Sequence, residues 1–325
     1  FQGDLSPIQE QAVHALVEHD FGVFVAPPGS GKTVVGANLV ADYGHVIVDE
    51  CHHVPAVSFE RIMREVKARY VTGLTATPLR RDGHHPILHL QLGPVRFSID
   101  PKSQATAQPF EHKLIVRSTE FRLASDAADA GIQEVYRQIA MDERRNRLIL
   151  DDVIQALDEK RSPILLTERR DHLDYLAKHL HGPARNLVVL HGGMKAKDRR
   201  AAIRQLTSIP QNEERLVLAT GRFIGEGFDD ARLDTLFLAM PVSWRGTLVQ
   251  YAGRLHRKHH GKTEVRIMDY VDRDVPMLAR MFERRMRGYR AMGYVVTDHV
   301  APEPIDDYVI EYDEGALEIP DDDSF

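Results

Sequence analysis

A glycine-rich loop between an apolar strand and a helix is the feature that most constrains how this chain can fold. The strand pattern covers Phe21–Val25, a helical pattern covers residues 32–41, and the loop between them reads Ala26-Pro27-Pro28-Gly29-Ser30-Gly31-Lys32-Thr33. Glycine lets the backbone turn so that its N–H groups point inward and cradle phosphate oxygens, and the helix N-terminus adds partial positive charge. The chain is therefore predicted to be an α/β protein built around a phosphate-binding loop, with Ala26 in place of the usual first glycine.

The same loop predicts which side chains hold the ligand. Backbone contacts to phosphate are expected from Pro28, Gly29, Ser30 and Gly31. Lys32 is placed to reach the β- and γ-phosphates of a nucleoside triphosphate, and the Thr33 hydroxyl to coordinate Mg²⁺. ATP and Mg²⁺ are therefore the expected cofactors.

Two adjacent carboxylates end the next apolar strand, in the run Val46-Ile47-Val48-Asp49-Glu50. Asp49 suits a second Mg²⁺ contact, and Glu50 suits the group that orients or deprotonates the attacking water in phosphoryl transfer. On its own the pair also fits an ordinary surface turn. The phosphate loop upstream favours the nucleotide interpretation.

Strand and helix patterns alternate through most of the sequence, which is typical of a parallel sheet covered by helices. Strands are expected at 21–25, 45–49, 70–75, 164–167, 187–191, 216–220, 235–240 and 265–270, and helices at 32–41, 60–69, 169–181 and 195–207. A polar, alanine-rich stretch near 118–131 separates two such series. We expect a first domain at 1–117, a linker at 118–145, a second domain at 146–300 and an acidic tail at 301–325, with ligands at the carboxyl ends of the strands.

The charge distribution bears on the partner. The net charge is −6, but residues 301–325 hold ten acidic side chains and no lysine or arginine, so residues 1–300 carry 42 basic against 38 acidic groups, or +4. A mildly basic body permits a phosphate-binding groove, and the solvated acidic tail could serve a protein partner. No apolar run approaches the roughly 20 residues that span a bilayer, and the single cysteine, Cys51, favours a reducing, cytoplasmic setting.

Several motifs in this order and spacing resemble superfamily 2 helicases. Asp49-Glu50-Cys51-His52 resembles their DExH signature, Leu74-Thr75-Ala76-Thr77-Pro78 their third motif, and Gln250-Tyr251-Ala252-Gly253-Arg254-Leu255-His256-Arg257 their sixth. The resemblance covers roughly residues 5–272 and is greatest to the branch of restriction-type translocases and bacterial repair helicases. It implies two RecA-like parallel-sheet domains with an ATP cleft between them.

The resemblance also implies roles for particular residues. Gln9 would read adenine, and Arg254 and Arg257 would reach the γ-phosphate from the second domain. By resemblance of residues 219–229 to the fifth motif, Asp229 would contact the ribose of the nucleotide or position an arginine. Coupling between the sites would fall to His52, Thr75, Thr77 and Gln250, and nucleic-acid contacts to Thr167, Arg169, Gly192 and Thr220. For Gln9, a solvent-facing helix position is the alternative, and for the strand-end contacts an ordinary structural role is equally compatible with the sequence.

The chain departs from the family in one place. Only fifteen residues separate Thr33 from Asp49, where the family usually has a far longer interval that holds motifs Ia and Ib. A deletion, a segment missing from the sequence and a compact divergent domain all remain open. Loss of these motifs would keep the ATP ligands and remove half of the nucleic-acid track.

These patterns favour an ATP-dependent nucleic-acid helicase or translocase, with DNA favoured over RNA. The alternative is an ATP-gated nucleic-acid clamp or remodelling module that does not unwind, impaired by loss of motifs Ia and Ib. A phosphate-loop small-molecule kinase is a third reading, and the arginines of a second α/β domain argue against it.

Overall fold

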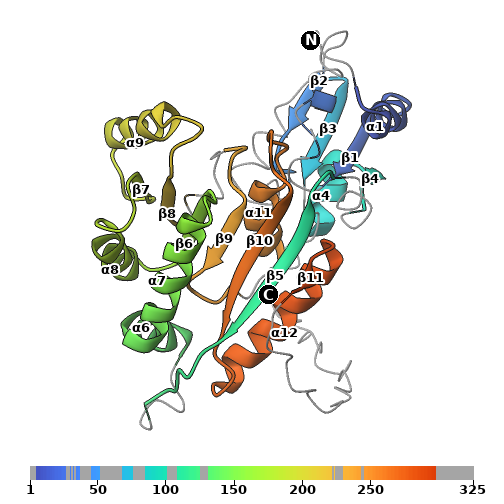
Figure 1. Ribbon diagram of the computed structural model, residues 1–325. Helices are drawn as coiled ribbons and strands as arrows, with labels where there is room; N and C mark the ends of the chain where they lie inside the picture. Colours follow the sequence, from blue (N-terminus) through green and yellow to red (C-terminus); the bar gives the residue numbers. More distant parts are fainter. Residues whose placement is uncertain are drawn as a thin grey trace, which may run out of the picture.

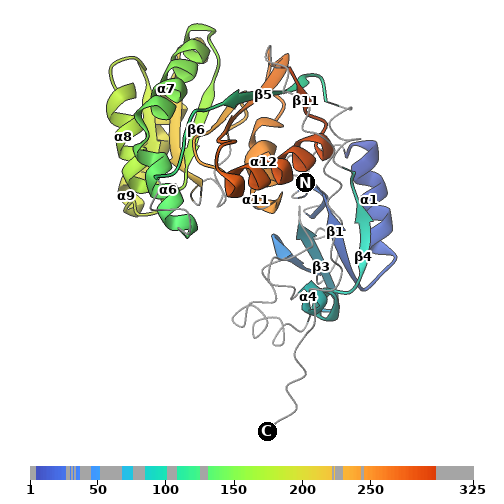
Figure 2. The same cartoon turned by 90° about the horizontal axis from the view of Figure 1, so that it is seen from below.

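The computed structural model describes two parallel sheets covered by helices (Figure 1 and Figure 2). It describes residues 5–26, 30, 32, 34–36, 45–51, 68–75, 85–100, 108–124, 131–221, 223, 230–242 and 245–297. The predicted acidic tail at 301–325 and most of the predicted helix at 60–69 lie outside these residues. All the strand pairs in both sheets are parallel, which confirms the predicted fold class.

The first sheet has the strand order β2-β3-β1-β4. Its strands are β1 (Phe21–Val25), β2 (His45–Val48), β3 (Tyr70–Thr75) and β4 (Val95–Ser98), and its described helices of more than one turn are α1 (Pro7–Val17) and α4 (His85–Leu92). Phe24 packs in a cluster with Leu16 of α1, whereas Val23 packs in another with Leu88 of α4. Because successive side chains of a strand point to opposite faces, α1 and α4 cover opposite faces of this sheet.

Strand order fixes where the first-sheet motifs meet. β3 lies between β1 and β2, and the three strands run in the same direction. Their carboxyl ends, which lead to the phosphate loop, to Thr75 and to Asp49, therefore lie along one edge of the sheet. Gly73 permits close packing beneath this edge, because a Cβ there would lie 2.8 Å from a Leu92 methyl and 2.9 Å from the Cys51 sulfur.

The second sheet has the order β11-β5-β10-β9-β6-β8-β7. Its strands are β5 (Glu111–Ser118), β6 (Pro163–Thr167), β7 (Leu187–Leu190), β8 (Leu216–Thr220), β9 (Thr235–Leu238), β10 (Glu264–Val271) and β11 (Val295–Val296). Its helices are α6 (Ile132–Met141), α7 (Glu143–Asp158), α8 (Arg170–Leu180), α9 (Ala196–Ser208), α11 (Arg245–Leu255) and α12 (Pro276–Ala291).

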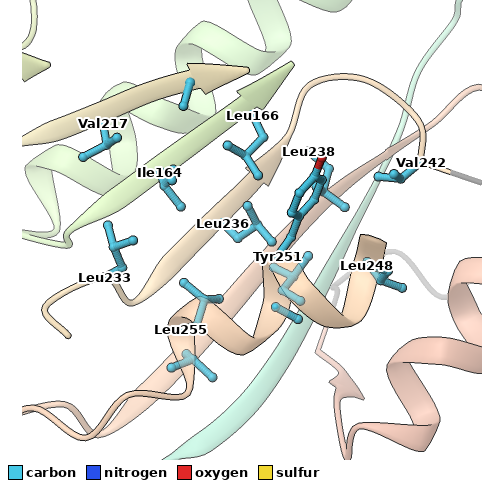
Figure 3. Packing of buried hydrophobic residues seen from close by; sticks show 14 of the residues in the cluster. Ile164, Leu166, Val217, Leu233, Leu236, Leu238, Val242, Leu248, Tyr251 and Leu255 are labelled. Atoms are coloured by element: carbon cyan, nitrogen blue, oxygen red, sulfur yellow. The ribbon is translucent and has the colours of Figure 1, made fainter. Parts of the chain in front are cut away.

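Two apolar clusters sandwich the second sheet. One gathers Ile164 and Leu236 with side chains of α9, α11 and α12, and Figure 3 shows the part of it around α11. The other gathers Leu165 and Phe237 with side chains of α7 and α8. Alternate residues of β6 and β9 thus face opposite layers, so each strand is buried on both sides, as the near-continuous apolar runs of the sequence indicate.

The observed second domain starts earlier in the chain than expected. β5 pairs with β10 along its whole length, from Glu111↔Glu264 to Ser118↔Val271, so residues 111–117 belong to the second sheet and not to the first. Helix α6 and the start of α7 occupy the predicted linker at 118–145, with Val135 and Ile139 fully buried. The alternation of β5 identifies a strand but carries no information about the sheet to which it hydrogen-bonds.

No helix of the described chain is both long and apolar enough to cross a bilayer.

Candidate nucleotide-binding site

The phosphate loop starts at the end of β1, and three described hydrogen bonds hold it, two to other elements and one across the loop itself. The Ala26 N–H donates to the Thr75 carbonyl at 2.9 Å, which joins the loop to the end of β3. The Lys32 amine donates to the Ala26 carbonyl at 3.3 Å across the loop. The Gln9 side-chain amide donates to the Ser30 carbonyl at 3.0 Å. Pro28, Gly29, Gly31 and Thr33 lie outside the described residues.

Gln9 has both ends of its amide engaged. Its oxygen accepts the backbone N–H of Ser6, at the N-cap of α1, at 2.9 Å, while its nitrogen donates to Ser30. The family resemblance implies that Gln9 reads adenine. In the structure the Gln9 side chain supports the phosphate loop, and one hydrogen of its amide remains for a base.

The two carboxylates follow β2 in a tight turn. The Glu50 N–H donates to the Asp49 Oδ1 at 2.9 Å, and Glu50 has a positive φ of 47°. This left-handed conformation is uncommon for residues other than glycine and costs of order 1–3 kcal/mol. Strain of this kind is concentrated at functional sites, where the surrounding structure holds it in place.

Charged groups that follow strands of the first sheet and charged groups of the second domain both act on the Lys32 amine. Burial has the largest effect on it and lowers the pKa of its amine. The carboxylates of Glu50 and Asp49 act in the opposite direction, whereas the nearby charges of Arg257 and Arg254 lower the pKa further. Helix α11, which carries Arg254, packs against the second sheet (Figure 3). The arginines of the second sheet are thus close enough to Lys32 to act on its charge.

The balance of charge at this point favours an anion. Lys32, Arg254 and Arg257 bring three positive charges against the two of Asp49 and Glu50, so polyphosphate would offset the surplus. For Mg²⁺, the described donor is the exposed Asp49 carboxylate, whereas Thr33, the other predicted ligand, lies outside the described residues. No group of three His, Cys, Asp or Glu side chains in the described chain could hold a metal. This donor set fits Mg²⁺, which is usually bound through one or two carboxylates, water and substrate phosphates.

Lys262 holds the chain on which Arg257 lies, and sequence reasoning missed it. Its amine lies 2.7–3.0 Å from the carbonyl oxygens of Ala231, Leu233, Leu255 and Arg257, so its three N–H groups are shared among four acceptors. Two of these carbonyls belong to the end of α11 and the turn after it, where a cation is favourable. Burial lowers the pKa of Lys262 to about 8, and the charges of Asp234 and Asp230 oppose this. A lysine in a turn gives no indication in the sequence that its amine contacts four backbone carbonyls.

The coupling candidates are only partly described. Thr75 is fully buried at the end of β3 and accepts the Ala26 N–H, so it contacts the start of the phosphate loop. Gln250 lies half-buried on α11, one turn before Arg254. His52, Thr77 and Asp229 lie outside the described residues.

The strand-end residues of the second sheet lie along one edge but differ in exposure. Thr167 and Thr220 are register partners at the ends of β6 and β8, and Gly192 follows the neighbouring β7. Thr167 is 1% exposed, with its hydroxyl 3.0 Å from the His172 Nδ1. Its hydroxyl therefore serves the interior of the domain. Arg169 forms an ion pair with Asp171, Gly192 is exposed and Thr220 is half-buried.

A buried polar network extends from Thr167. The His172 Nε2 lies 2.8 Å from the Asn146 side-chain oxygen, and the Asn146 amide donates to the Ala140 carbonyl at 2.9 Å. These residues come from β6, α8, α7 and α6, so the network fastens the end of β6 to three helices. Burial lowers the pKa of His172 to about 3, so the ring is neutral at physiological pH.

Comparison with known proteins agrees with this arrangement. The profile of the helicase conserved C-terminal domain matches residues 146–259, and that of the type III restriction enzyme res subunit matches residues 41–80. The putative ATP-dependent RNA helicase L396 of Acanthamoeba polyphaga mimivirus is 22% identical over 281 residues, which are 82% of this chain and 50% of that protein. The DNA 3′-5′ helicase XPB of Kineococcus radiotolerans is 30% identical over 164 residues, 49% of this chain and 28% of that protein.

Solved structures share the fold. The ATP-dependent type ISP restriction-modification enzyme LlaBIII bound to DNA aligns with 93% of this chain and 31% of its own at a TM-score of 0.64 and 13% identity. Dbp5 of S. cerevisiae bound to RNA and ADP BeF3 aligns with 90% of this chain and 75% of its own at a TM-score of 0.51 and 11% identity.

The fold, the motifs and these matches together define the class: residues 146–259 match the helicase conserved C-terminal domain, and the chain is similar to superfamily 2 helicases. The match of residues 41–80 to the res subunit of type III restriction enzymes points to the restriction-type branch. The chain spans about half the length of the curated relatives it matches over most of its own length.

Proposed function

We propose that this chain is an ATP-dependent helicase or translocase that acts on DNA. The observation that carries the proposal is the convergence on Lys32 of charges from both sheets: Glu50 and Asp49 from the first, Arg257 and Arg254 from the second. A site divided in this way can hold the two domains together when ATP is bound and release them after hydrolysis.

Each group has a distinct part in the proposed reaction. The Glu50 carboxylate orients the attacking water and accepts its proton, while Lys32 neutralises charge on the transferred phosphoryl group. Arg254 and Arg257 stabilise the charge that spreads over its oxygens in the transition state. Bound Mg²⁺ would neutralise charge on the β- and γ-phosphates, with Asp49 and Thr33 as its protein ligands.

Nucleic acid is the proposed partner, and we propose Thr220 and Gly192 as contact residues because they lie at or just after the ends of the neighbouring strands β8 and β7. The +4 charge of residues 1–300 supports binding to phosphate. One relative is named a DNA helicase and one solved neighbour is described as bound to DNA, whereas another relative is named an RNA helicase. We favour DNA on these grounds.

A clamp or remodelling module that binds in an ATP-gated manner without unwinding is the second candidate. The fifteen residues between Thr33 and Asp49 favour it, because this interval leaves little room for the motifs that grip the backbone. The match to the restriction-enzyme profile begins within this interval, at residue 41.

We also place the protein in a reducing, cytoplasmic compartment. Cys51 is fully buried, and burial next to the Glu50 and Asp49 carboxylates raises the pKa of its thiol to about 12, so it stays protonated. The acidic segment at 301–325 is our candidate for contact with a protein partner.

The test is ATP hydrolysis with and without single-stranded DNA, duplex DNA and single-stranded RNA, combined with strand displacement. A helicase gives stimulation by DNA and separation of strands, and a clamp gives stimulation or ATP-dependent binding without separation. Lys32→Ala controls for contaminating ATPases. Turnover that ignores every nucleic acid would contradict a helicase, and the further absence of ATP-dependent binding would contradict a clamp as well.

A further inference from the structure

One hydrogen bond connects the strand ends of the second sheet to the helix that carries Arg254. The Tyr251 hydroxyl donates to the Glu168 carboxylate at 3.0 Å. Tyr251 lies on α11, between Gln250 and Arg254, and Glu168 lies between Thr167 at the end of β6 and Arg169 at the N-cap of α8. The bond thus spans 83 residues of sequence and joins the two parts of this domain to which we assign ATP and nucleic acid.

The bond passes over a third segment, at the end of β8. A Cβ at Gly221 would lie 1.9 Å from the Tyr251 hydroxyl oxygen and 2.3 Å from the Glu168 carboxylate. Real Cβ atoms do not approach other atoms so closely, so only glycine fits beneath the pair. Gly221 follows Thr220, and the pair therefore touches the ends of both β6 and β8.

The two partners differ in exposure. Tyr251 is 4% exposed and packs within the apolar cluster between the sheet and α11, as Figure 3 shows. Glu168 keeps part of its surface exposed, yet enough protein surrounds its carboxylate to raise its pKa. The hydrogen bond therefore joins the exposed Glu168, next to the strand ends, to the buried Tyr251 on α11. A change at the surface can reach the helix through it without breaking the apolar core.

We propose that Tyr251 and Glu168 are positioning residues that couple nucleic-acid binding at the ends of β6 and β8 to the placement of Arg254 and Arg257. Neither side chain needs to touch ATP or nucleic acid in this role. The inference rests on the proposed function, since it requires that nucleic acid binds at those strand ends.

The decisive variant is Tyr251→Phe, which keeps the buried ring and removes only the hydroxyl. ATP turnover without nucleic acid should stay within about twofold of the wild type, because no group assigned to ATP is altered. Stimulation of turnover by single-stranded DNA should fall about tenfold, the size of change expected when one hydrogen bond to a charged group is lost. The factor by which a non-hydrolysable ATP analogue changes the affinity for DNA should also fall. The factor by which DNA changes the affinity for the analogue should fall by the same amount, because coupling between two binding equilibria is reciprocal.

Other variants separate coupling from a general loss of packing. Glu168→Gln keeps an acceptor and should retain most of the stimulation, whereas Glu168→Ala should match Tyr251→Phe. The double variant Tyr251→Phe/Glu168→Ala should be no worse than either single one. Tyr136→Phe is the matched control: its hydroxyl, on α6, donates to the Pro241 carbonyl at 2.7 Å, and its loss should leave coupling unchanged.

The outcomes are distinguishable. If wild-type turnover is not stimulated by any nucleic acid, the proposed function fails and the coupling role fails with it. If the wild type is stimulated and Tyr251→Phe is stimulated to the same extent, the proposed function stands and the coupling role is wrong. Equal loss in Tyr251→Phe and Tyr136→Phe would indicate a packing effect and would also overturn it.

Discussion

The Gln9 side-chain nitrogen lies 3.0 Å from the Ser30 carbonyl oxygen, so the first helix of the chain directly supports the phosphate loop. The oxygen of the same side chain accepts the Ser6 N–H at the start of that helix. Gln9 therefore makes the conformation of the loop dependent on the N-terminus of α1.

Gln9→Glu is expected to weaken ATP binding without unfolding α1. The carboxylate still accepts the Ser6 N–H, but it cannot donate to Ser30 and repels its carbonyl. Loss of this partly buried hydrogen bond, with a negative charge added next to the carbonyl, costs about 1–2 kcal/mol, so the KM for ATP should rise by about tenfold. Gln11→Glu, at an exposed position of the same helix, is the control for added charge. An unchanged KM would show that the Ser30 contact does not shape the site.

Much of the fold could be predicted from local patterns. The apolar runs at Phe21–Val25, Tyr70–Thr75 and Leu216–Thr220 are strands as expected, and the helices at 169–181 and 195–207 are observed at Arg170–Leu180 and Ala196–Ser208. Each of these elements is buried on a face that its own sequence marks as apolar, so a short window contains the information.

The sheet to which β5 belongs and the helices of the expected linker could not be predicted in this way. β5 is defined by its pairing with β10, about 150 residues downstream. The site has the same limitation. The buried ion pair between Arg145 and Asp272, 2.9 Å apart, and the contacts of Lys262 join residues whose partners no local pattern reveals. Arg285 of α12 is likewise buried and hydrogen-bonded to Asp269, 16 residues earlier in the chain.

Glu50→Gln should abolish turnover and keep nucleotide binding. The amide cannot take a proton from water, and general-base groups typically contribute about 10²–10⁴-fold, so kcat should fall by about a thousandfold. ATP should bind at least as tightly, because one negative charge is removed near the phosphates. Single-turnover hydrolysis and nucleotide binding measure the two effects, with Glu18→Gln on the exposed end of α1 as control. Normal hydrolysis would mean that another group activates the water.

Lys262→Met should lower kcat at nearly constant ATP affinity. The variant keeps the length of the side chain but leaves four carbonyls without the amine, so the turn that carries Arg257 should loosen. We expect kcat to fall about tenfold and the free energy of unfolding to fall by about 3 kcal/mol. Lys258→Met, at an exposed position nearby, should change neither. Full activity of Lys262→Met would show that Arg257 is held by other contacts.

The second domain should lose stability at pH values well above the ordinary pKa of a carboxyl group. Burial lowers the pKa of His112 to about 4 and those of His172 and His256 to about 3. Each ring takes up a proton on unfolding at pH values below about 6.5, the ordinary value, so stability is complete above that pH and falls as pH decreases toward 4. The slope should approach about 1.4 kcal/mol per pH unit for each histidine.

Denaturant unfolding at pH 7.5, 6.5, 5.5 and 4.5 measures this slope. His256→Gln can still form a hydrogen bond with the Tyr294 hydroxyl but does not titrate, so it should reduce the slope by the contribution of one histidine. A free energy of unfolding that does not change between pH 7 and 5 would rule out neutral, buried histidines.

The central claim is that one ATP site is assembled from both sheets, and Arg257→Ala tests it most directly. Arg257 acts on Lys32 from the second sheet, so its removal should leave ATP and ADP affinity within about threefold of the wild type. Binding of ADP–aluminium fluoride, which mimics the transition state, should weaken at least about a hundredfold, since an arginine at this point contributes about 10³–10⁵ in kcat. Equal affinity of the wild type and Arg257→Ala for that complex would contradict an ATP site shared by the two sheets.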